Sequence, residues 1–122
     1  MRKFLNSFKY ALRGLFVLAK AERNFKIELL FAVFAIALSC VLKLSALEFL
    51  FVLLAITLVL LAELFNTAIE KIMDFIHPEK HDAVRDIKDL SAGAVLLAII
   101  FAFIIALFVF VPKLYSALLA FL

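Results

Sequence analysis

The sequence predicts an all-α integral membrane protein, with an N-terminal amphipathic interface helix followed by three transmembrane helices. Of its 122 residues, 68% are hydrophobic and only 13 basic and 10 acidic side chains are charged. A water-soluble domain of this length cannot bury so much apolar surface. The charges are also unevenly distributed, because none lies in residues 29–42, 49–62 or 90–112. These three runs, in a chain of mean hydropathy +1.20, are candidate membrane spans.

Residues 1–23 are expected to form an amphipathic surface helix. At about 100° per residue, most apolar side chains of residues 4–19 fall within one wide arc. The opposite arc is mainly cationic and carries Lys3, Asn6, Lys9, Tyr10, Arg13 and Lys20. Such a helix lies flat in a membrane interface, because its apolar face enters the acyl region while its cations meet anionic head groups. A helix packed on partner helices is the alternative, which the cationic arc makes less favourable.

The membrane helices are expected at residues 27–47, 48–76 and 83–112, within a single domain covering residues 1–122. The first two uncharged runs have 14 residues each, which cover only about 21 Å of a hydrocarbon core about 30 Å thick. Both must therefore extend into their flanks, with Lys43 snorkelling to the far interface. His77-Pro78 is expected to end the second helix, because proline disfavours helical geometry in the preceding residue. Asp82 is the expected N-cap of the third.

Lysine and arginine are concentrated on one side of the predicted membrane. Eleven of the 13 lie in the N-terminal segment or in residues 71–89, whereas Lys43 and Lys113 flank the other side. The positive-inside rule therefore places the N-terminus and the 71–89 loop in the cytoplasm. Two glycines, Gly14 and Gly93, are too few for a Walker loop or a dinucleotide-binding turn. The single Cys40 is expected to be an inert buried thiol.

Four polar side chains form a stripe on the second membrane helix. Measured from Glu63, helical spacing brings Asn66, Glu70 and Asp74 within an arc of about 80°. Glu63 is expected inside the cytoplasmic edge of the hydrocarbon, where a carboxylate costs several kcal/mol unless it is protonated, paired or metal-bound. Glu63 is therefore a functional candidate. Glu63 could instead pair with a basic residue on another helix. On its own helix, Lys71 is the only basic residue available to Glu63, Glu70 and Asp74.

Because the acidic side chains of the stripe have too few basic partners, a bound divalent cation is the favoured explanation of their charge. Oxygen ligands from Glu70, Asp74 and either Glu22 or Glu28 suit Mg²⁺, which keeps waters and is often shared with substrate phosphates. The turn Glu22-Arg23-Asn24 is close enough in sequence to the first span to join the site. The metal hypothesis in turn implies a nucleotide.

Lys88 and Asp89 on the third membrane helix are expected to face the acidic stripe. There the lysine could screen phosphate charge and the aspartate could orient it or help hold the metal. Both could instead be ordinary interfacial charges, and His81 could contact nucleotide or simply be a solvated loop residue. An acid at the edge of an apolar compartment suits phosphoryl transfer to a lipid hydroxyl, with Glu63 taking the hydroxyl proton.

The run Ala62-Glu63-Leu64-Phe65-Asn66-Thr67-Ala68-Ile69-Glu70, followed by Asp74, Lys88-Asp89 and A-G-A-V-L-L-A at 92–98, closely resembles the small prokaryotic diacylglycerol kinase and undecaprenol kinase family. The resemblance covers nearly the whole chain. It implies a homotrimer of three-span chains in the prokaryotic cytoplasmic membrane, with sites shared between neighbouring subunits. It also implies ATP as phosphoryl donor and Mg²⁺ as the metal.

The resemblance also implies roles for individual residues. Glu63 would be the catalytic base, and Glu22 and Glu70 would bind the metal and, through it, the nucleotide. The other expected ATP contacts are Tyr10, Glu79, Lys80, His81, Lys88 and Asp89. The expected supporting residues are Asn66, Asp74, Glu28 and Lys3, of which Lys3 stands where the family often has an arginine.

The expected partners are a lipid alcohol, ATP, the membrane and further copies of the chain, with no nucleic acid. In this family, diacylglycerol-specific members have a serine at the position of Ala92, whereas undecaprenol kinases have an alanine there, as this chain does. That difference favours undecaprenol over diacylglycerol. A second hypothesis is a non-enzymatic oligomer, holin-like or a channel, whose pore the carboxylates line. Lys88-Asp89 disfavours it, because a cation pore would not place a lysine ring beside its acidic ring.

Overall fold

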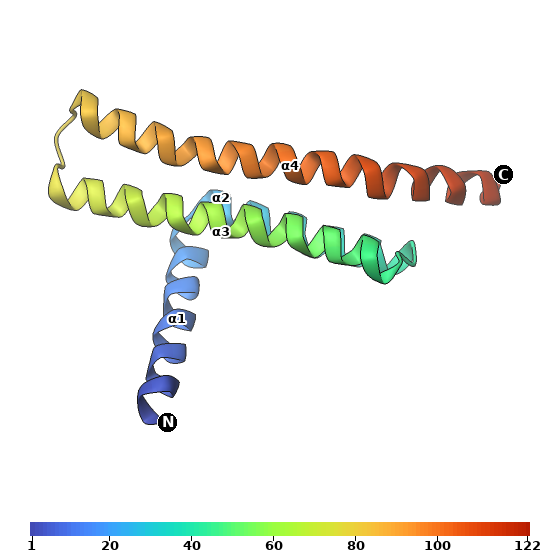
Figure 1. Cartoon of the computed structure of the whole chain (residues 1–122), viewed down its shortest axis with the longest axis horizontal. Helices are drawn as coiled ribbons and strands as arrows, with labels where there is room; N and C mark the ends of the chain where they lie inside the picture. Colours follow the sequence, from blue (N-terminus) through green and yellow to red (C-terminus); the bar gives the residue numbers. More distant parts are fainter.

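The computed structural model describes the whole chain, residues 1–122, as four helices without strands. They are α1 (Arg2–Ala21), α2 (Arg23–Val41), α3 (Ala46–Ile76) and α4 (Asp82–Phe121). The two longest, α3 and α4, lie antiparallel and side by side, α2 packs mainly against α3, and α1 projects crosswise from the bundle (Figure 1). α2, α3 and α4 are each long and apolar enough to cross a membrane. The predicted all-α membrane fold is confirmed.

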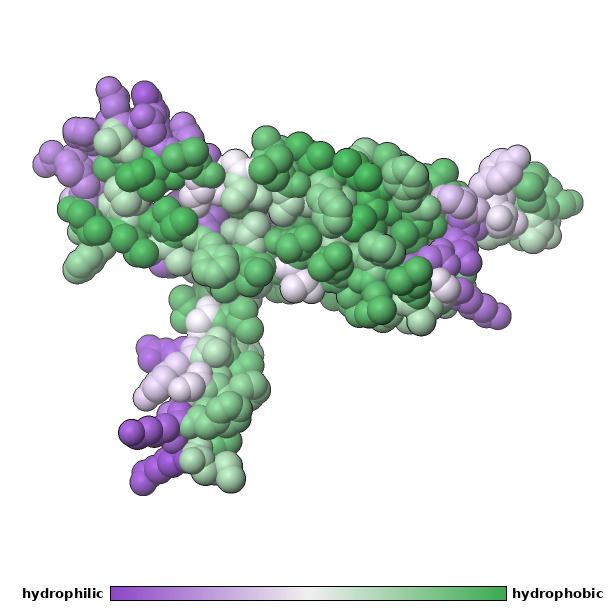
Figure 2. Space-filling model, viewed as in Figure 1, coloured by the Kyte–Doolittle hydropathy of each residue, from purple (hydrophilic) through white to green (hydrophobic).

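The surface of the bundle is apolar between two polar ends. Only 13 of the 122 residues are buried, so most apolar side chains face outward rather than into a protein core. On the face seen in Figure 2, they form a broad band between the polar α3–α4 connection and a second polar group at the opposite end. Such a band is stable only when it contacts lipid tails, because exposing so many apolar side chains to water costs free energy.

α1 has the geometry of an interface helix. Its chain turns into α2 at Glu22, whose extended backbone (φ −102°, ψ 117°) separates the two helices. Leu18, which is 4% exposed, anchors the end of α1 against the bundle. In Figure 2, the apolar flank of α1 is on the side of the apolar band, and its cationic flank faces the polar α3–α4 end. This orientation matches a helix lying along the membrane surface.

The first membrane helix occupies Arg23–Val41 rather than the expected residues 27–47. It ends early because Lys43 has a positive φ of 54°, a conformation that helices do not continue through. Ser45 then starts α3 with a capping box, in which its side chain and that of Glu48 each accept a backbone N–H. The 19 residues of α2 still measure about 28 Å, close to the thickness of a hydrocarbon core.

α4 is longer at both ends than the expected residues 83–112. Its N-cap is His81 rather than Asp82, because the Nδ1 atom of His81 accepts the N–H of Ala83 at 3.0 Å. Its other end continues through Pro112 to Phe121, because one missing N–H does not stop a helix whose following residues are mostly leucine and alanine. Cys40 also differs from expectation, since it is exposed in the last turn of α2 rather than buried.

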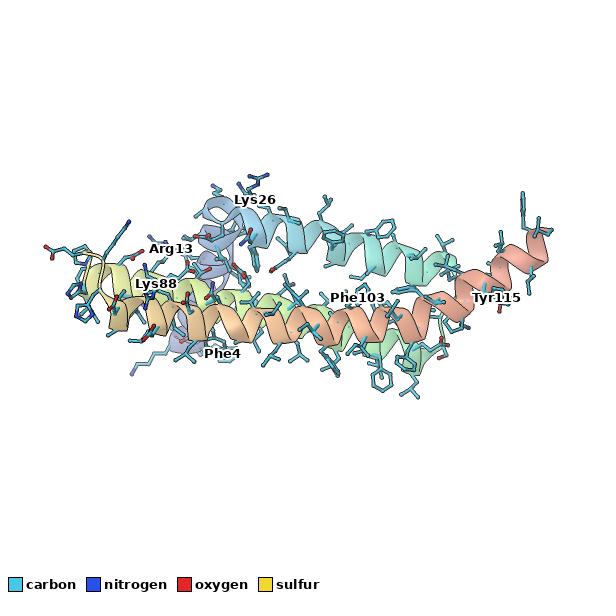
Figure 3. All side chains as sticks on the ribbon, turned by 90° about the horizontal axis from the view of Figure 1, so that it is seen from above. Phe4, Arg13, Lys26, Lys88, Phe103 and Tyr115 are labelled. Carbon is cyan, nitrogen blue, oxygen red and sulfur yellow. The ribbon has the colours of Figure 1, made fainter.

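α3 and α4 form the tightest pair of helices. Val52 and Ala55 on α3 pack against Ile105 and Val109 on α4 in the main buried cluster. α2 is separated from α3 and α4 by a wider gap, as the view from above shows (Figure 3). The resulting space between α2, α3 and α4 is the first component of the site.

Candidate functional site

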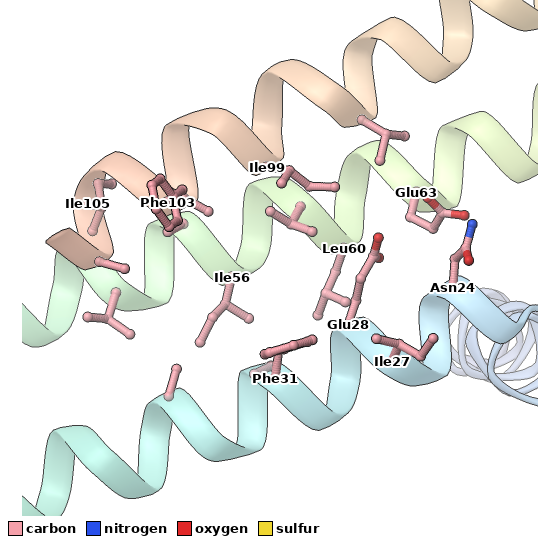
Figure 4. Close-up of a pocket in the computed structure, with 18 of the residues that line it drawn as sticks. Asn24, Ile27, Glu28, Phe31, Ile56, Leu60, Glu63, Ile99, Phe103 and Ile105 are labelled. Atoms are coloured by element: carbon pink, nitrogen blue, oxygen red, sulfur yellow. The ribbon is translucent and has the colours of Figure 1, made fainter. Parts of the chain in front are cut away.

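An elongated apolar cavity of about 670 Å³ separates α2 from α3 and α4. Of its 19 lining residues, 16 are hydrophobic, and the remaining three are Asn24, Glu28 and Glu63. These three gather at one end, where Glu28 reaches from α2 toward α3 and Glu63 turns toward Asn24 (Figure 4). The cavity is therefore apolar along its length, with hydrogen-bonding side chains only at the end nearest α1.

Glu63 is almost completely enclosed, with 4% of its surface exposed. No basic side chain forms an ion pair with it, and the charges that act on it most strongly are the carboxylates of Glu70 and Glu22. Glu28 also interacts electrostatically with Glu63, and its Oε2 atom is buried without a hydrogen-bond partner. Glu22, Glu28 and Glu70 thus each interact electrostatically with Glu63, and no basic side chain pairs with Glu63.

Asn66 connects the acidic stripe to α4. Its Nδ2 atom donates to Oε1 of Glu70 at 3.2 Å, and its Oδ1 atom accepts from the Oγ atom of Ser91 at 2.7 Å. Asn66 and Ser91 are each 8% exposed, so this bridge is shielded from water and sets the direction of the Glu70 carboxylate. The sequence pattern alone did not indicate this role of Ser91. The available signal was that a buried amide oxygen needs a donor from the neighbouring helix.

The carboxylates that could hold Mg²⁺ are few. No group of three or more His, Cys, Asp or Glu side chains converges as a metal site within the chain. Glu22 and Glu70 are nevertheless both close enough to Glu63 to act on it electrostatically. Mg²⁺ commonly takes only one or two protein carboxylates and completes its shell with water and substrate phosphates. This donor set fits Mg²⁺ bound together with a nucleotide, but not a cage made of protein alone.

A second, polar cavity of about 540 Å³ lies at the α3–α4 connection. It brings together six of the residues selected from the sequence, namely Asp74, Glu79, Lys80, His81, Lys88 and Asp89. Lys88 Nζ pairs with Asp74 Oδ1 at 2.5 Å, which joins the two helices. The connection itself is ordered by the His81 cap and by a 3.0 Å contact between His77 Nδ1 and the carbonyl of Glu79.

Several selected residues lie outside both cavities. Tyr10 and Lys3 are exposed on α1 and line neither one. Glu22 and Glu70 also line neither, although both act on Glu63. Ala92, the position that favoured undecaprenol, is exposed and does not line the apolar cavity.

Together these features define a membrane-embedded protein with a buried acid between an apolar cavity and a polar, lysine-containing one. Residues 9–110 match the family described as prokaryotic diacylglycerol kinase. The chain belongs to this family and is a lipid kinase, which confirms the resemblance seen in the sequence. A non-enzymatic holin-like or channel role is not favoured.

Individual relatives carry two names. The chain is 35% identical to an undecaprenol kinase of Bacillus subtilis over 114 residues, which cover 93% of each chain. It is 36% identical to a diacylglycerol kinase of Synechocystis over 113 residues, or 92% of this chain and 65% of that protein. A diacylglycerol kinase of Escherichia coli is 30% identical over 102 residues, 84% of each chain. The relatives' names therefore leave two lipids to consider.

Proposed function

We propose that the chain transfers the γ-phosphate of ATP to the hydroxyl of a membrane lipid alcohol, and that undecaprenol is preferred to diacylglycerol. The observation that carries this proposal is the position of Glu63. Its carboxylate is enclosed at the polar end of an apolar cavity, close to the acids that would hold a metal. A lipid hydroxyl could meet a base there while its tail stays out of water.

On the lipid side, the tail would lie along the cavity and the hydroxyl would reach the end formed by Asn24, Glu28 and Glu63. Glu63 would accept the hydroxyl proton as the lipid oxygen forms its bond to the γ-phosphorus, while the bond from that phosphorus to the bridging oxygen breaks and ADP leaves. The amide of Asn24 would donate a hydrogen bond that orients this oxygen. The near-complete enclosure of Glu63 would exclude water, which otherwise competes with the lipid as the phosphoryl acceptor.

On the nucleotide side, the polar cavity would receive ATP. Lys88 would exchange its partner Asp74 for phosphate oxygens, and Glu79, Lys80, His81 and Asp89 line the same space. Glu22 and Glu70 would hold Mg²⁺, with Asn66 fixing the direction of Glu70. The metal would supply neutralisation of the charge on the transferring phosphoryl group.

The preference for undecaprenol has two supports. Ala92 matches the pattern of undecaprenol kinases described above. In addition, Asn24 is the only side-chain donor that lines the apolar cavity. Diacylglycerol would bring two ester carbonyls to this end, and burying them without donors is costly. Undecaprenol brings a single hydroxyl, which Asn24 and Glu63 can satisfy.

We also infer a homotrimer whose active sites face the cytoplasm. Tyr10 and Lys3 line neither cavity of their own chain. In a trimer, α1 of one chain could bring these side chains to a site of its neighbour. The cytoplasmic orientation follows from the excess of lysine and arginine at the end of the bundle that carries the polar cavity.

The proposal is tested with purified protein in lipid nanodiscs that contain either undecaprenol or diacylglycerol. Mg-ATP labelled in the γ-phosphate is added, and phosphorylated lipid is separated and counted. Transfer to both lipids with a higher kcat/KM for undecaprenol is expected. A higher kcat/KM for diacylglycerol would reject the proposed preference, and absence of transfer to either lipid would reject both candidate substrates.

A further inference from the structure

The last part of α4 lies beyond the membrane core. The 22 residues from Leu90 to Val111 measure about 33 Å, enough to cross a core of about 30 Å. At the far end, Lys113 Nζ pairs with Glu48 Oε1 at 3.4 Å, beside the Ser45 capping box that begins α3. These polar groups mark the interface opposite the polar cavity. Residues 114–122 therefore extend past the core, where α3 no longer accompanies them (Figure 1).

This extension is strongly amphipathic. At about 100° per residue, its large apolar side chains fall within an arc of about 160°. They are Leu114, Tyr115, Leu118, Leu119, Phe121 and Leu122. The rest of the circumference carries only small or polar side chains: Lys113, Ser116, Ala117 and Ala120. The apolar arc is uncovered in the chain, since Leu118 is 57% exposed and Phe121 is 89% exposed.

Pro112 provides a point at which the extension can change direction. Its missing N–H leaves the carbonyl four residues earlier without a helical partner, so bending the helix there costs fewer hydrogen bonds than bending it elsewhere. Figure 3 shows the turns around Tyr115 directed away from the axis of the preceding helix. A straight extension would instead expose five leucine and phenylalanine side chains to water.

We propose that residues 113–122 lie along the membrane surface on the side opposite the active site, with their apolar arc in lipid and Lys113, Ser116 and Ala120 toward water. The occupant of the apolar arc is the bilayer because this arc directly continues the lipid-facing surface of α4. Tyr115 is suited to the interface, where its ring meets lipid and its hydroxyl meets water. The segment follows residues 9–110, which match the family.

The test measures how the extension sits in a bilayer. In a Cys40→Ala background, single cysteines are introduced as Leu118→Cys or Ser116→Cys, spin-labelled, and reconstituted in vesicles. Collision with oxygen reports lipid, and collision with a water-soluble nickel chelate reports water. The ratio of oxygen to nickel collisions is expected to be several-fold higher at position 118 than at position 116, and both labels should be mobile.

Two results would overturn the proposal. Equal, high nickel collision at both positions would mean that the extension stands in water. Loss of both oxygen and nickel collision at position 118, with an immobilised label, would mean that protein covers the apolar arc, as in contact with another copy of the chain. Neither position belongs to the proposed catalytic machinery, so retained lipid phosphorylation serves as the check that both labelled variants are folded.

Discussion

Asn66 has the most demanding environment of the residues around the site. Its amide donates to Glu70 and accepts from Ser91 on α4, and the two residues of that interhelical bond are both buried. Inside a membrane protein, a buried amide oxygen has no water to replace a lost partner. Asn66 therefore both joins α3 to α4 and fixes a proposed metal ligand.

Removing the Ser91 hydroxyl is expected to destabilise the protein. Ser91→Ala leaves the amide oxygen of Asn66 without its donor, and interhelical hydrogen bonds in membranes contribute on the order of 1 kcal/mol. The measurement is unfolding by increasing denaturing detergent, followed by circular dichroism. Ser7→Ala is the matched control, because the Ser7 hydroxyl bonds only to the Lys3 carbonyl on an exposed helix. Equal losses of stability in the two variants would show that the Asn66 bridge contributes nothing specific.

The stripe containing Asn66 could be predicted because helical spacing alone places Glu63, Asn66 and Glu70 on one side. The partners of these residues could not. The bond from Ser91 and the approach of Glu28 to Glu63 depend on how far α4 and α2 are rotated against α3. A single sequence contains no direct information on those rotations.

At the scale of elements, the separation of α2 from α4 is what creates the apolar cavity. Alanines line it on both sides, Ala32 and Ala35 from α2 and Ala102 and Ala106 from α4. Small side chains usually let membrane helices approach closely. Here they leave a space that a lipid tail can fill.

Filling this space is expected to weaken lipid use specifically. Ala102→Phe places a ring in the cavity, where crowding costs about 1–3 kcal/mol, so the KM for the lipid should rise about tenfold or more. The KM for ATP should stay unchanged, because the polar cavity is lined by the first turns of α4, about 20 Å along the helix from Ala102. Val33→Phe, on the exposed surface of α2, is the control. An unchanged lipid KM in Ala102→Phe would exclude the cavity as the tail site.

The existence and type of all four helices could be predicted, because uncharged runs and amphipathic spacing are properties of the sequence. Several helix ends could not, among them the end of α2 and the end of α4. α2 stops at Val41 because Lys43 adopts a positive φ, which is unusual for lysine, and α4 passes through Pro112, which sequence rules treat as a boundary.

At the scale of the whole molecule, charge divides the protein into two unlike ends. The polar cavity and most of the basic side chains lie at one end, and the Glu48–Lys113 pair lies at the other. α1 projects from the bundle at a point nearer the polar cavity than the opposite end, and its cationic flank faces the polar cavity (Figure 2). This arrangement favours one orientation in a membrane.

Cys40 allows the orientation to be measured with the native chain. It is exposed in the last turn of α2, at the end opposite the polar cavity. In intact cells, a membrane-impermeant maleimide added outside is expected to modify it. A Cys40→Ser, Asn6→Cys variant carries its thiol on the polar arc of α1 and should react only after the cells are permeabilised. The reverse pattern would contradict a cytoplasmic active site.

The most direct test of the account replaces the carboxylate of Glu63 by an amide of the same shape. Lipid phosphorylation by Glu63→Gln is measured in nanodiscs beside Glu48→Gln, which removes an acid from the opposite interface. Because a positioned base contributes about 10²–10⁴-fold, Glu63→Gln should lose at least about a hundredfold in kcat while Glu48→Gln keeps wild-type turnover. Near-wild-type turnover in folded Glu63→Gln would contradict the assignment of Glu63 as the base.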